Sequence, residues 1–319
     1  MHITCGYHTD IWPQSGCRGK VSRYKFLLVC PFQNSCLDDK SQDMQRAGEG
    51  WVARTREGPG MSVPAALLFD VDGTLADTER DGHRVAFNQA FQDAGLDWHW
   101  SDARYGELLA VSGGKERIRC YMDRYHSGFR PPMPLDAFIA ALHQSKNRHY
   151  AALLETGRIP LRPGVRRLLA EARAAGIPLL IVTTTSPENV LSLLEYCVEP
   201  GSAGWFEVIA AGDVVPAKKP APDIYHYALA QGGLAAAECL ALEDSENGLR
   251  AARAAGVPTV VTVSHYTQEQ DFSGALLVVD HLGEPEQPFH IRSGAVHGAT
   301  WVDLDLLRRL HPGSRAAGG

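Results

Sequence analysis

The sequence predicts an α/β protein in which an all-helical domain interrupts a parallel β-sheet. Three observations support this. Residues 65–69 form a short apolar run typical of a buried strand, no strand pattern follows between Asp77 and Pro160, and apolar runs alternate with helical segments from residue 165 onward. Because strands that alternate with helices form a parallel sheet covered on both faces, the helical block is expected to be a second domain, a cap over the strand ends.

The bulk composition is that of a globular protein. Of the 319 residues, 45% are hydrophobic and 21% are charged, and the formal net charge is −6. This charge gives no reason to expect nucleic acid or an anionic membrane as a partner, and no apolar run has the length that a bilayer span requires. The seven cysteines lack the paired spacing of a metal site, so we expect reduced thiols in a cytoplasmic protein. We also expect a monomer.

Residues 1–60 differ from the rest of the chain. They hold four of the seven cysteines, show no sustained periodicity and end in the turn-rich stretch 56–60, whereas Met61 stands just before the first expected strand. They lack the long apolar core of a secretory signal, and their acidic residues argue against a transit peptide. We expect a poorly ordered N-terminal extension, or sequence upstream of a misassigned start codon. The α/β core is then predicted to comprise residues 61–77 and 160–319, and the cap residues 78–159.

The cap is expected to consist of helices alone. Its first segment carries valine, phenylalanine and alanine at helical spacing, as in an amphipathic helix. Three prolines between residues 131 and 134 separate the last two segments. The expected helices cover residues 80–95, 102–109, 115–125 and 135–155.

The expected elements of the core alternate along the chain. Its strands are short, apolar and bounded by turn residues, as buried strands are. After the first strand, further strands are expected at residues 177–182, 208–211, 239–242, 259–263 and 276–279. Helices are expected at residues 165–175, 187–198, 222–231, 245–255 and 303–310.

The first expected strand ends in two acids. Asp70 and Asp72 are separated by one residue and are followed by Gly73 and Thr74. Asp70 would lie at the carboxyl end of the strand, where open α/β sheets bind ligands. Because alternate strand residues point to opposite faces, the two carboxylates converge only if the chain turns after Asp70, and Gly73 makes a tight turn easy.

Three further polar groups follow strands of the same expected sheet. Residues 183–186, Thr-Thr-Thr-Ser, offer hydroxyl and N–H donors before a helix, a place that suits a phosphate. Lys219 is a cation held stiffly by neighbouring prolines. Glu243 and Asp244 add two carboxylates. Acids so crowded repel one another unless a cation joins them, and Mg²⁺, which takes oxygen ligands and accompanies substrate phosphate, fits this set.

Together these motifs resemble the haloacid dehalogenase superfamily of phosphatases and phosphomutases. The matching motifs are Asp-x-Asp-Gly-Thr (70–74), a threonine after the next strand, Lys-Pro-x-Pro-Asp (219–223) and Glu-Asp-Ser-x-x-Gly (243–248). The resemblance implies a Rossmann-like parallel-sheet core with an inserted α-helical cap. Stretches 77–84, 105–117 and 264–267 resemble the CbbY-like branch. Its characterised bacterial members dephosphorylate xylulose-1,5-bisphosphate, an inhibitory by-product of the carbon-fixing enzyme Rubisco.

The resemblance also implies a role for each core residue. Asp70 is the nucleophile and forms an aspartyl-phosphate, and Asp72 is the general acid and base. Thr184 and Lys219 neutralise the phosphoryl oxygens. The implied ligands of Mg²⁺ are Asp70, the backbone carbonyl of Asp72, Asp244 and, through bound water, Glu243.

Selectivity must come from the cap, since the core motifs hold only the phosphoryl group that is transferred. Residues 113–117 are expected to form a loop running into a helix, where N–H groups and two cations meet an anion. An ordinary solvated helix face is the alternative for these cations, and His83 is expected to be an ordinary helical histidine. The candidate substrate-binding residues are Glu79, Gly113, Gly114, Lys115, Arg117, Lys146, Thr184, Thr185 and Lys219.

Three functions fit these residues. The first is a Mg²⁺-dependent sugar-phosphate phosphatase, a phosphoric monoester hydrolase acting on xylulose-1,5-bisphosphate or a similar sugar bisphosphate. The second is a sugar phosphomutase of the beta-phosphoglucomutase kind, which shares the core residues but protects the aspartyl-phosphate from water. The third is a non-catalytic protein that binds a phosphorylated metabolite. The intact acids at all core positions argue against the third.

Overall fold

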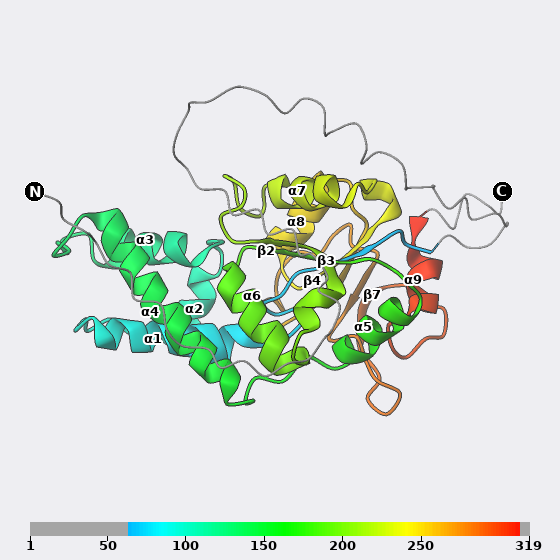
Figure 1. Cartoon of the computed structure of the whole chain (residues 1–319), viewed down its shortest axis with the longest axis horizontal. Helices are drawn as coiled ribbons and strands as arrows, with labels where there is room; N and C mark the ends of the chain where they lie inside the picture. Colours follow the sequence, from blue (N-terminus) through cyan, green and yellow to red (C-terminus); the bar gives the residue numbers. More distant parts are fainter. Residues whose placement is uncertain (1–62, 313–319) are drawn as a thin grey trace, which may run out of the picture. The chain divides into compact units, whose positions relative to one another are not determined.

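The computed structural model describes residues 63–312, and the predicted extension at residues 1–60 lies outside this range. Its strands are β1 (Leu67–Phe69), β2 (Leu179–Thr183), β3 (Phe206–Ala211), β4 (Leu240–Glu243), β5 (Thr259–Thr262), β6 (Leu277–Val279) and β7 (Ile291–Gly294). They form a seven-stranded sheet in the order β3-β2-β1-β4-β5-β6-β7 (Figure 1). Neighbouring strands from β3 to β6 are parallel, and β7 is antiparallel to β6.

Strand β1 lies where the chain order in the sheet reverses. It pairs with β2 on one side and with β4 on the other, so that Phe69 is opposite both Ile181 and Leu242. Ligands bind to open α/β sheets at such a switch point, beyond the carboxyl ends of the strands. The residues at the ends of β1, β2 and β4 therefore meet at one edge of the sheet. This arrangement confirms the predicted Rossmann-like parallel sheet.

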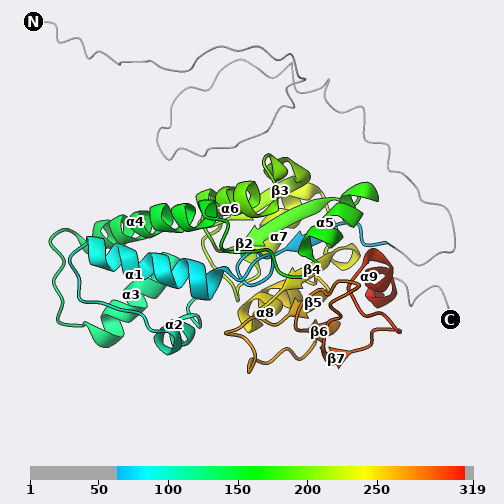
Figure 2. The ribbon, with the colours of Figure 1, turned by 90° about the horizontal axis from the view of Figure 1, so that it is seen from below.

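Helices cover both faces of the sheet. The helical elements of the core are α5 (Val165–Ala174), α6 (Pro187–Leu193), η2 (Leu194–Val198), η3 (Ser202–Trp205), α7 (Asp223–Gly232), η4 (Ala236–Glu238), α8 (Glu246–Ala254) and α9 (Leu304–Leu310). Leu67 and Phe69 pack in one cluster with α5, α6 and α9, and Leu68 packs in another with α7 and α8 (Figure 2). Burial on both faces explains why the strands read as continuous apolar runs.

A second group of helices follows β1 and has its own hydrophobic core. Figures 1 and 2 both show these helices side by side, next to the sheet. Aromatic rings fill the space between them, including Phe87, Phe91, Trp98 and Trp100. The elements are η1 (Glu79–His83), α1 (Arg84–Asp93), α2 (Asp102–Leu108), α3 (Gly114–Tyr125) and α4 (Leu135–Glu155). We call this group the cap; its predicted boundaries at residues 77/78 and 159/160 stay a prediction.

The chain crosses between the sheet and the cap twice, and the two crossings are paired. Ala76 and Leu161 form an antiparallel bridge, and the Arg162 N–H donates to the Leu75 carbonyl at 2.9 Å. The buried Arg162 guanidinium donates to the backbone carbonyls of Gly73, Thr262, Val263 and Asp280. Because a guanidinium presents its donors in a rigid fork, this side chain fixes the turn after β1 against the ends of β5 and β6.

A few elements differ from the expectations. The helix expected at residues 80–95 begins with the π-helical turn η1, and the one expected at 187–198 is divided into α6 and the π-helical turn η2. Strand β7 is not predicted, because all four of its residues are exposed and no apolar alternation marks it. Between residues 63 and 312, no helix combines the length and the apolar character that crossing a bilayer demands.

Candidate active site

A tight turn after β1 places both acids of the Asp-x-Asp motif at the sheet edge. Gly73 has a φ of +86°, a conformation that favours glycine. A Cβ at this position would lie 2.1 Å from Asp244 Oδ2, so the turn also packs closely against the second acidic segment. The Thr74 hydroxyl donates to Asp70 Oδ2 at 3.3 Å. Backbone conformation and close packing therefore demand the glycine of this motif.

A pocket of about 300 Å³ lies at this edge of the sheet. Core residues border it at the ends of β1, β2, β4 and β5, and cap residues border it from η1 and from the segment around α2 and α3. Charged side chains of both signs therefore face one cavity. The predicted site residues that line it are Asp70, Asp72, Glu79, Arg117, Thr184, Lys219 and Asp244.

Lys219 connects Asp70 to the acid at the end of β4. Its side chain is 5% exposed, and its Nζ donates to Asp70 Oδ1 and Glu243 Oε1, both at 2.7 Å. The Val182 carbonyl accepts a third hydrogen bond from Nζ at 2.8 Å. Burial by itself would lower the pKa of Lys219, but the two carboxylates outweigh burial and hold that pKa above its ordinary value. Lys219 is therefore a fixed cation beside Asp70.

Glu243 is fully buried and is held from two further sides. The Tyr225 hydroxyl of α7 donates to Glu243 Oε1. Gly248 of α8 leaves room for the carboxylate, since a Cβ there would lie 1.9 Å from Glu243 Oε2. This Oε2 has no hydrogen-bond partner among residues 63–312. Because a buried polar atom without a partner is unfavourable, Oε2 is suited to accept from a metal-bound water.

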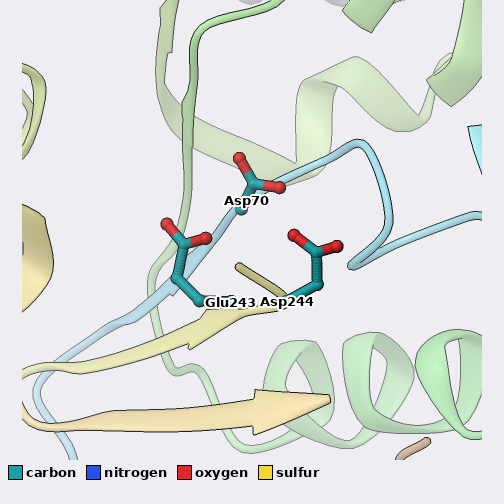
Figure 3. A group of neighbouring side chains, drawn as sticks. All are labelled: Asp70, Glu243 and Asp244. Carbon is teal, nitrogen blue, oxygen red and sulfur yellow. The ribbon is translucent and has the colours of Figure 1, made fainter. Parts of the chain in front are cut away.

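Three carboxylates converge where β1 and β4 end (Figure 3). One oxygen of each of Asp70, Glu243 and Asp244 lies within 4.8 Å of the others, and all three residues are buried. Burial raises the pKa of Asp70 to about 7, against the effect of Lys219 and with a contribution from Glu243. Burial and the charge of Asp70 raise the pKa of Asp244 well above its usual range. Such crowding favours a bound cation, and the oxygen donors are those that Mg²⁺ prefers, so these residues fit the predicted ion.

Asp72 lies in a different environment from Asp70. The Thr78 hydroxyl donates to Asp72 Oδ1 at 2.6 Å, and His83 Nε2 lies 2.8 Å from the same oxygen. Burial works to raise the pKa of Asp72, but the charge and hydrogen bond of His83, together with Thr78, outweigh burial and hold that pKa well below its usual range. Two acids whose pKa values are pushed apart are suited to different chemical roles.

Glu79 and Arg117 line the cap side of the pocket, and Tyr105 joins them. The Tyr105 hydroxyl donates to Glu79 Oε2 and accepts from Arg117 Nη1 at 2.9 Å. Arg117 is 7% exposed, and its Nη1 lies 4.0 Å from Glu79 Oε2. Within the described chain, Arg117 Nε has no hydrogen-bond acceptor. A buried arginine with an unused donor beside a cavity is suited to bind an anion there.

Several predicted substrate-binding residues do not line the pocket. Lys115 forms an ion pair with Asp213 of the core and borders a separate hollow of about 630 Å³ beside α3. Thr185 Oγ1 accepts from the Asn189 side chain at 3.4 Å. Ser112 of the loop before α3 and Arg117 of the first turn of α3 do line the pocket. The predicted substrate-binding residues outside the pocket lining are Gly113, Gly114, Lys115, Lys146 and Thr185, and Glu243 of the predicted metal site does not line the pocket either.

Lys146 is a buried cation of the cap. Its Nζ lies 4.9 Å from the ring centre of Tyr150 and 5.3 Å from that of Phe87, and it donates to Asn147 Oδ1 at 3.5 Å. Burial lowers the pKa of Lys146 to about 8, although Asp72 is near enough to oppose this shift. Since a charge is costly to bury without an ion-pair partner, Lys146 is a candidate functional residue.

Sequence reasoning missed three residues that hold the site together. His83 was expected to be an ordinary helical histidine, but η1 follows the Asp-x-Asp turn directly and its last residue folds back onto Asp72. Tyr225 holds Glu243, and Tyr105 joins Glu79 to Arg117. The acidic partners of His83, Tyr225 and Tyr105 lie 11, 18 and 26 residues away along the chain. His83 and Tyr105 lie in the stretches that resemble the CbbY-like branch, whereas Tyr225 lies two residues beyond the Lys-Pro-x-Pro-Asp motif and was marked by no pattern.

Comparison with known sequences places the chain in a family. The profile of the haloacid dehalogenase-like hydrolases matches residues 64–256, more than half of the chain. Protein CbbY of Cupriavidus necator is 49% identical over 251 residues, which cover 78% of this chain and 97% of that protein. Protein CbbY of Cereibacter sphaeroides is 47% identical over 219 residues, covering 69% of this chain and 93% of that protein.

Comparison with solved structures leads to the same family. A crystal structure of CbbY from Rhodobacter sphaeroides in complex with phosphate matches with a TM-score of 0.64 and 46% identity, covering 69% of this chain and 94% of that one. A mutant of that CbbY in complex with xylulose-1,5-bisphosphate matches with a TM-score of 0.64 and 45% identity, with the same coverage. The chain therefore belongs to the haloacid dehalogenase-like hydrolase family and is a phosphatase similar to CbbY.

Proposed function

We propose that this phosphatase hydrolyses xylulose-1,5-bisphosphate or a similar sugar bisphosphate, with Mg²⁺ bound and through an aspartyl-phosphate at Asp70. The observation that carries the proposal is one pocket lined by a buried cation from each side, Lys219 of the core and Arg117 of the cap. Glu79, beside Arg117, is an acceptor suited to sugar hydroxyls. A sugar with two phosphates matches this arrangement. The xylulose-1,5-bisphosphate bound to the CbbY mutant supports this choice of substrate.

Asp70 supplies the nucleophile in the proposed reaction. One of its oxygens bonds to phosphorus while the bond between phosphorus and the sugar oxygen breaks, and Asp72 gives that sugar oxygen a proton. Water then attacks the aspartyl-phosphate, Asp72 takes a proton from the water, and inorganic phosphate leaves with Asp70 restored. Lys219 and Thr184 line the pocket beside Asp70 and stabilise the negative charge on the phosphoryl oxygens.

The surroundings of Asp72 suit the second half of this reaction. A carboxylate whose pKa is held low against the effect of burial is ionised at neutral pH, which is the form that accepts a proton from water, but the low pKa also makes it a weak base. In the first half Asp72 must carry a proton. The proposal therefore requires that the contact between Asp72 and His83 weakens when substrate fills the pocket.

The same acids are the proposed ligands of Mg²⁺. Asp70, Asp244 and the backbone carbonyl of Asp72 would hold the ion, and Glu243 would act through bound water. When bound, Mg²⁺ supplies positive charge that offsets the repulsion among these carboxylates and draws an anionic phosphoryl group toward Asp70. Glu243 Oε2, which has no hydrogen-bond partner between residues 63 and 312, and the raised pKa of Asp244 support this assignment.

Arg117 is the proposed ligand of the second phosphate. It is buried and lines the pocket, and its Nε has no acceptor in the part of the chain that the structure describes. The N–H groups of Gly113 and Gly114, at the start of α3, and the cations Lys115 and Lys146 are proposed to contribute at longer range. Thr185 is proposed to help shape the phosphate site after β2.

Phosphate release from a panel of sugar mono- and bisphosphates tests this function. We expect the highest kcat/KM with xylulose-1,5-bisphosphate or a close isomer, and one equivalent of inorganic phosphate per bisphosphate consumed. Chelation should stop turnover, and added Mg²⁺ should restore it. A sugar phosphomutase would convert one sugar phosphate into an isomer without net release of phosphate. That result, or no turnover with any member of the panel, would overturn the proposal.

A further inference from the structure

Two stretches that resemble the CbbY-like branch, residues 105–109 and 264–267, meet in the structure, although the proposed reaction gives them no role. Tyr266 lies in the core loop after β5, and its hydroxyl donates to Asp102 Oδ1 of α2 at 2.6 Å. Its ring lies against Gly106 of α2, where a Cβ would be 3.1 Å from Tyr266 Cδ1. His265 Nε2 lies 3.2 Å from Asp102 Oδ2. One core loop thus contacts α2 through hydrogen bonds and a packed ring.

The core end of this loop is fixed at the acidic site. The Ser264 N–H donates to Thr267 Oγ1 at 2.8 Å, which closes the loop on itself. Ser264 is also near enough to Asp244 to oppose the rise in the pKa of that carboxyl group. Ser264, Tyr266 and Thr267 line the same pocket as Asp244. The loop therefore lies at the acidic site and borders the pocket.

The cap end of the contact leads to the residues proposed to bind the substrate. The rings of Tyr266 and Tyr105 meet edge to face, with 5.7 Å between their centres. The Tyr105 hydroxyl in turn contacts Glu79 and Arg117. A chain of contacts therefore runs from this loop, which lines the pocket with Asp244, through Tyr105 to the cap side of the pocket.

We propose that Tyr266, held by Asp102, is a positioning residue that sets where Tyr105 and Arg117 lie relative to Asp70. The contacts of Tyr266 are seen in the structure. The expected effect of Tyr266 on the hydrolysis of a sugar bisphosphate rests on the proposed function. A substrate that must reach both the core and the cap depends on this spacing, because small misplacements of binding groups lower the rate strongly. A small aryl phosphate, which uses the core alone, does not depend on it.

Kinetics with two substrates test the proposal: xylulose-1,5-bisphosphate and p-nitrophenyl phosphate. Tyr266→Phe keeps the ring and removes the hydroxyl, so kcat/KM for the bisphosphate should fall roughly tenfold, the loss expected for one hydrogen bond to a charged group. Tyr266→Ala should lose more. Activity on p-nitrophenyl phosphate should change by less than about twofold. Asp102→Ala removes the acceptor of the Tyr266 hydroxyl, so Tyr266→Phe combined with Asp102→Ala should lose about as much as Asp102→Ala alone.

Matched controls are available within the cap. The Tyr125 hydroxyl lies 3.4 Å from Glu107 Oε2, and Asp136 pairs with Arg119. Because these contacts stay inside the cap, Tyr125→Phe and Asp136→Asn should leave kcat/KM unchanged for both substrates.

Hydrogen exchange of the unliganded enzyme gives a readout that does not depend on the substrate. Tyr266→Phe should speed amide exchange in α2 more than Tyr125→Phe does, because it loosens α2 from the core. Equal exchange in the two variants, or parallel losses on both substrates, would overturn the positioning role. A wild-type enzyme that fails to hydrolyse the bisphosphate would overturn the proposed function instead, and the exchange comparison would still decide the role of Tyr266.

Discussion

Asp70 and Asp72 are two residues apart, yet their side chains meet different partners. Asp70 faces two other carboxylates and one lysine, whereas Asp72 faces a hydroxyl and the ring of His83. The carboxylates and burial favour the protonated form of Asp70, while the partners of Asp72 favour its ionised form. The turn after β1 creates this difference, because it sends Asp70 toward β4 and Asp72 toward the cap.

Asp70→Asn is expected to abolish turnover without unfolding the protein. Asparagine keeps the volume of the side chain but removes the nucleophile and a metal ligand. The loss of the contact with Lys219 is offset by reduced repulsion from Glu243 and Asp244. Phosphate release and the Tm, measured on the same preparation, check this expectation. More than a trace of turnover would show that another residue is the nucleophile.

Asp72→Asn should slow both halves of the reaction, since an amide does not carry the proton. The expected loss is roughly 10² to 10⁴-fold, as for other general acid–base groups. Substrates with a good leaving group need less help from an acid, so aryl phosphates should lose less than sugar phosphates in the phosphorylation step. Single-turnover measurements compare the two, and equal losses would argue against the acid role of Asp72.

Lys146 is expected to lower the stability of the fold. Burial reduces its pKa to about 8 from the ordinary value of 10.5, so the unfolded state binds more protons between these values and stability should rise with pH across that window. Lys146→Met removes the charge and keeps most of the stem. At pH 7 its Tm should rise by an amount that corresponds to about 1–3 kcal/mol, while turnover of the sugar bisphosphate falls. A lower Tm would mean that partners stabilise the ammonium group.

At the scale of elements, the turn after β1 can pack against the end of β4 because Gly73 has no side chain. Gly73→Ala forces a side chain onto a φ of +86° and places a Cβ 2.1 Å from Asp244 Oδ2. Gly201→Ala is the matched control, since Gly201 has a φ of +80° and no atom within 4 Å of the added Cβ. Both variants should lose about 1 kcal/mol or more of stability through backbone strain.

Gly73→Ala, unlike the control, should also weaken the binding of Mg²⁺. Displacing Asp244 weakens a proposed ligand, so the Mg²⁺ concentration for half-maximal activity should rise in Gly73→Ala and stay unchanged in Gly201→Ala. A Mg²⁺ titration of both variants makes the comparison. An equal Mg²⁺ requirement would show that Asp244 is not a ligand.

Elements with a strong local signal could be predicted from the sequence. Helix α4 has the predicted bounds, 135–155, because prolines precede it and its apolar residues repeat at helical spacing. Strand β7 could not be predicted, since it exists only through its pairing with β6 and its side chains are exposed. The π-helical turns η1 and η2 could not be predicted either, because their residues fit an α-helix equally well.

At the scale of the whole molecule, one charged pocket is lined both by the ends of the sheet strands and by the cap, which has a hydrophobic core of its own. The core side of the pocket followed from the sequence, because each motif lies at the end of a strand and parallel strands end at the same edge. The residues that line the cap side of the pocket could not be predicted in the same way. Lys115 and Arg117 lie on the same short stretch, but one points to Asp213 and the other to Tyr105, and no local signal separates the two.

Arg117→Ala should impair the sugar bisphosphate on the order of 10²-fold in kcat/KM, since it removes a buried ligand of the second phosphate. Lys115→Ala should have a smaller effect. Arg119→Ala is the control, because Arg119 lies on the same helix but pairs with Asp136 away from the pocket. None of these changes should alter turnover of an aryl phosphate more than about twofold. Parallel losses on both substrates would show that Arg117 supports the fold instead.

The covalent intermediate with the sugar bisphosphate tests the central claim most directly. Wild-type enzyme is mixed with Mg²⁺ and xylulose-1,5-bisphosphate, quenched in acid within one turnover, and digested for mass spectrometry. We predict a phosphoryl group on Asp70 in the wild type and none in Asp70→Asn. Release of inorganic phosphate without that label, or a label on another residue, would contradict the account.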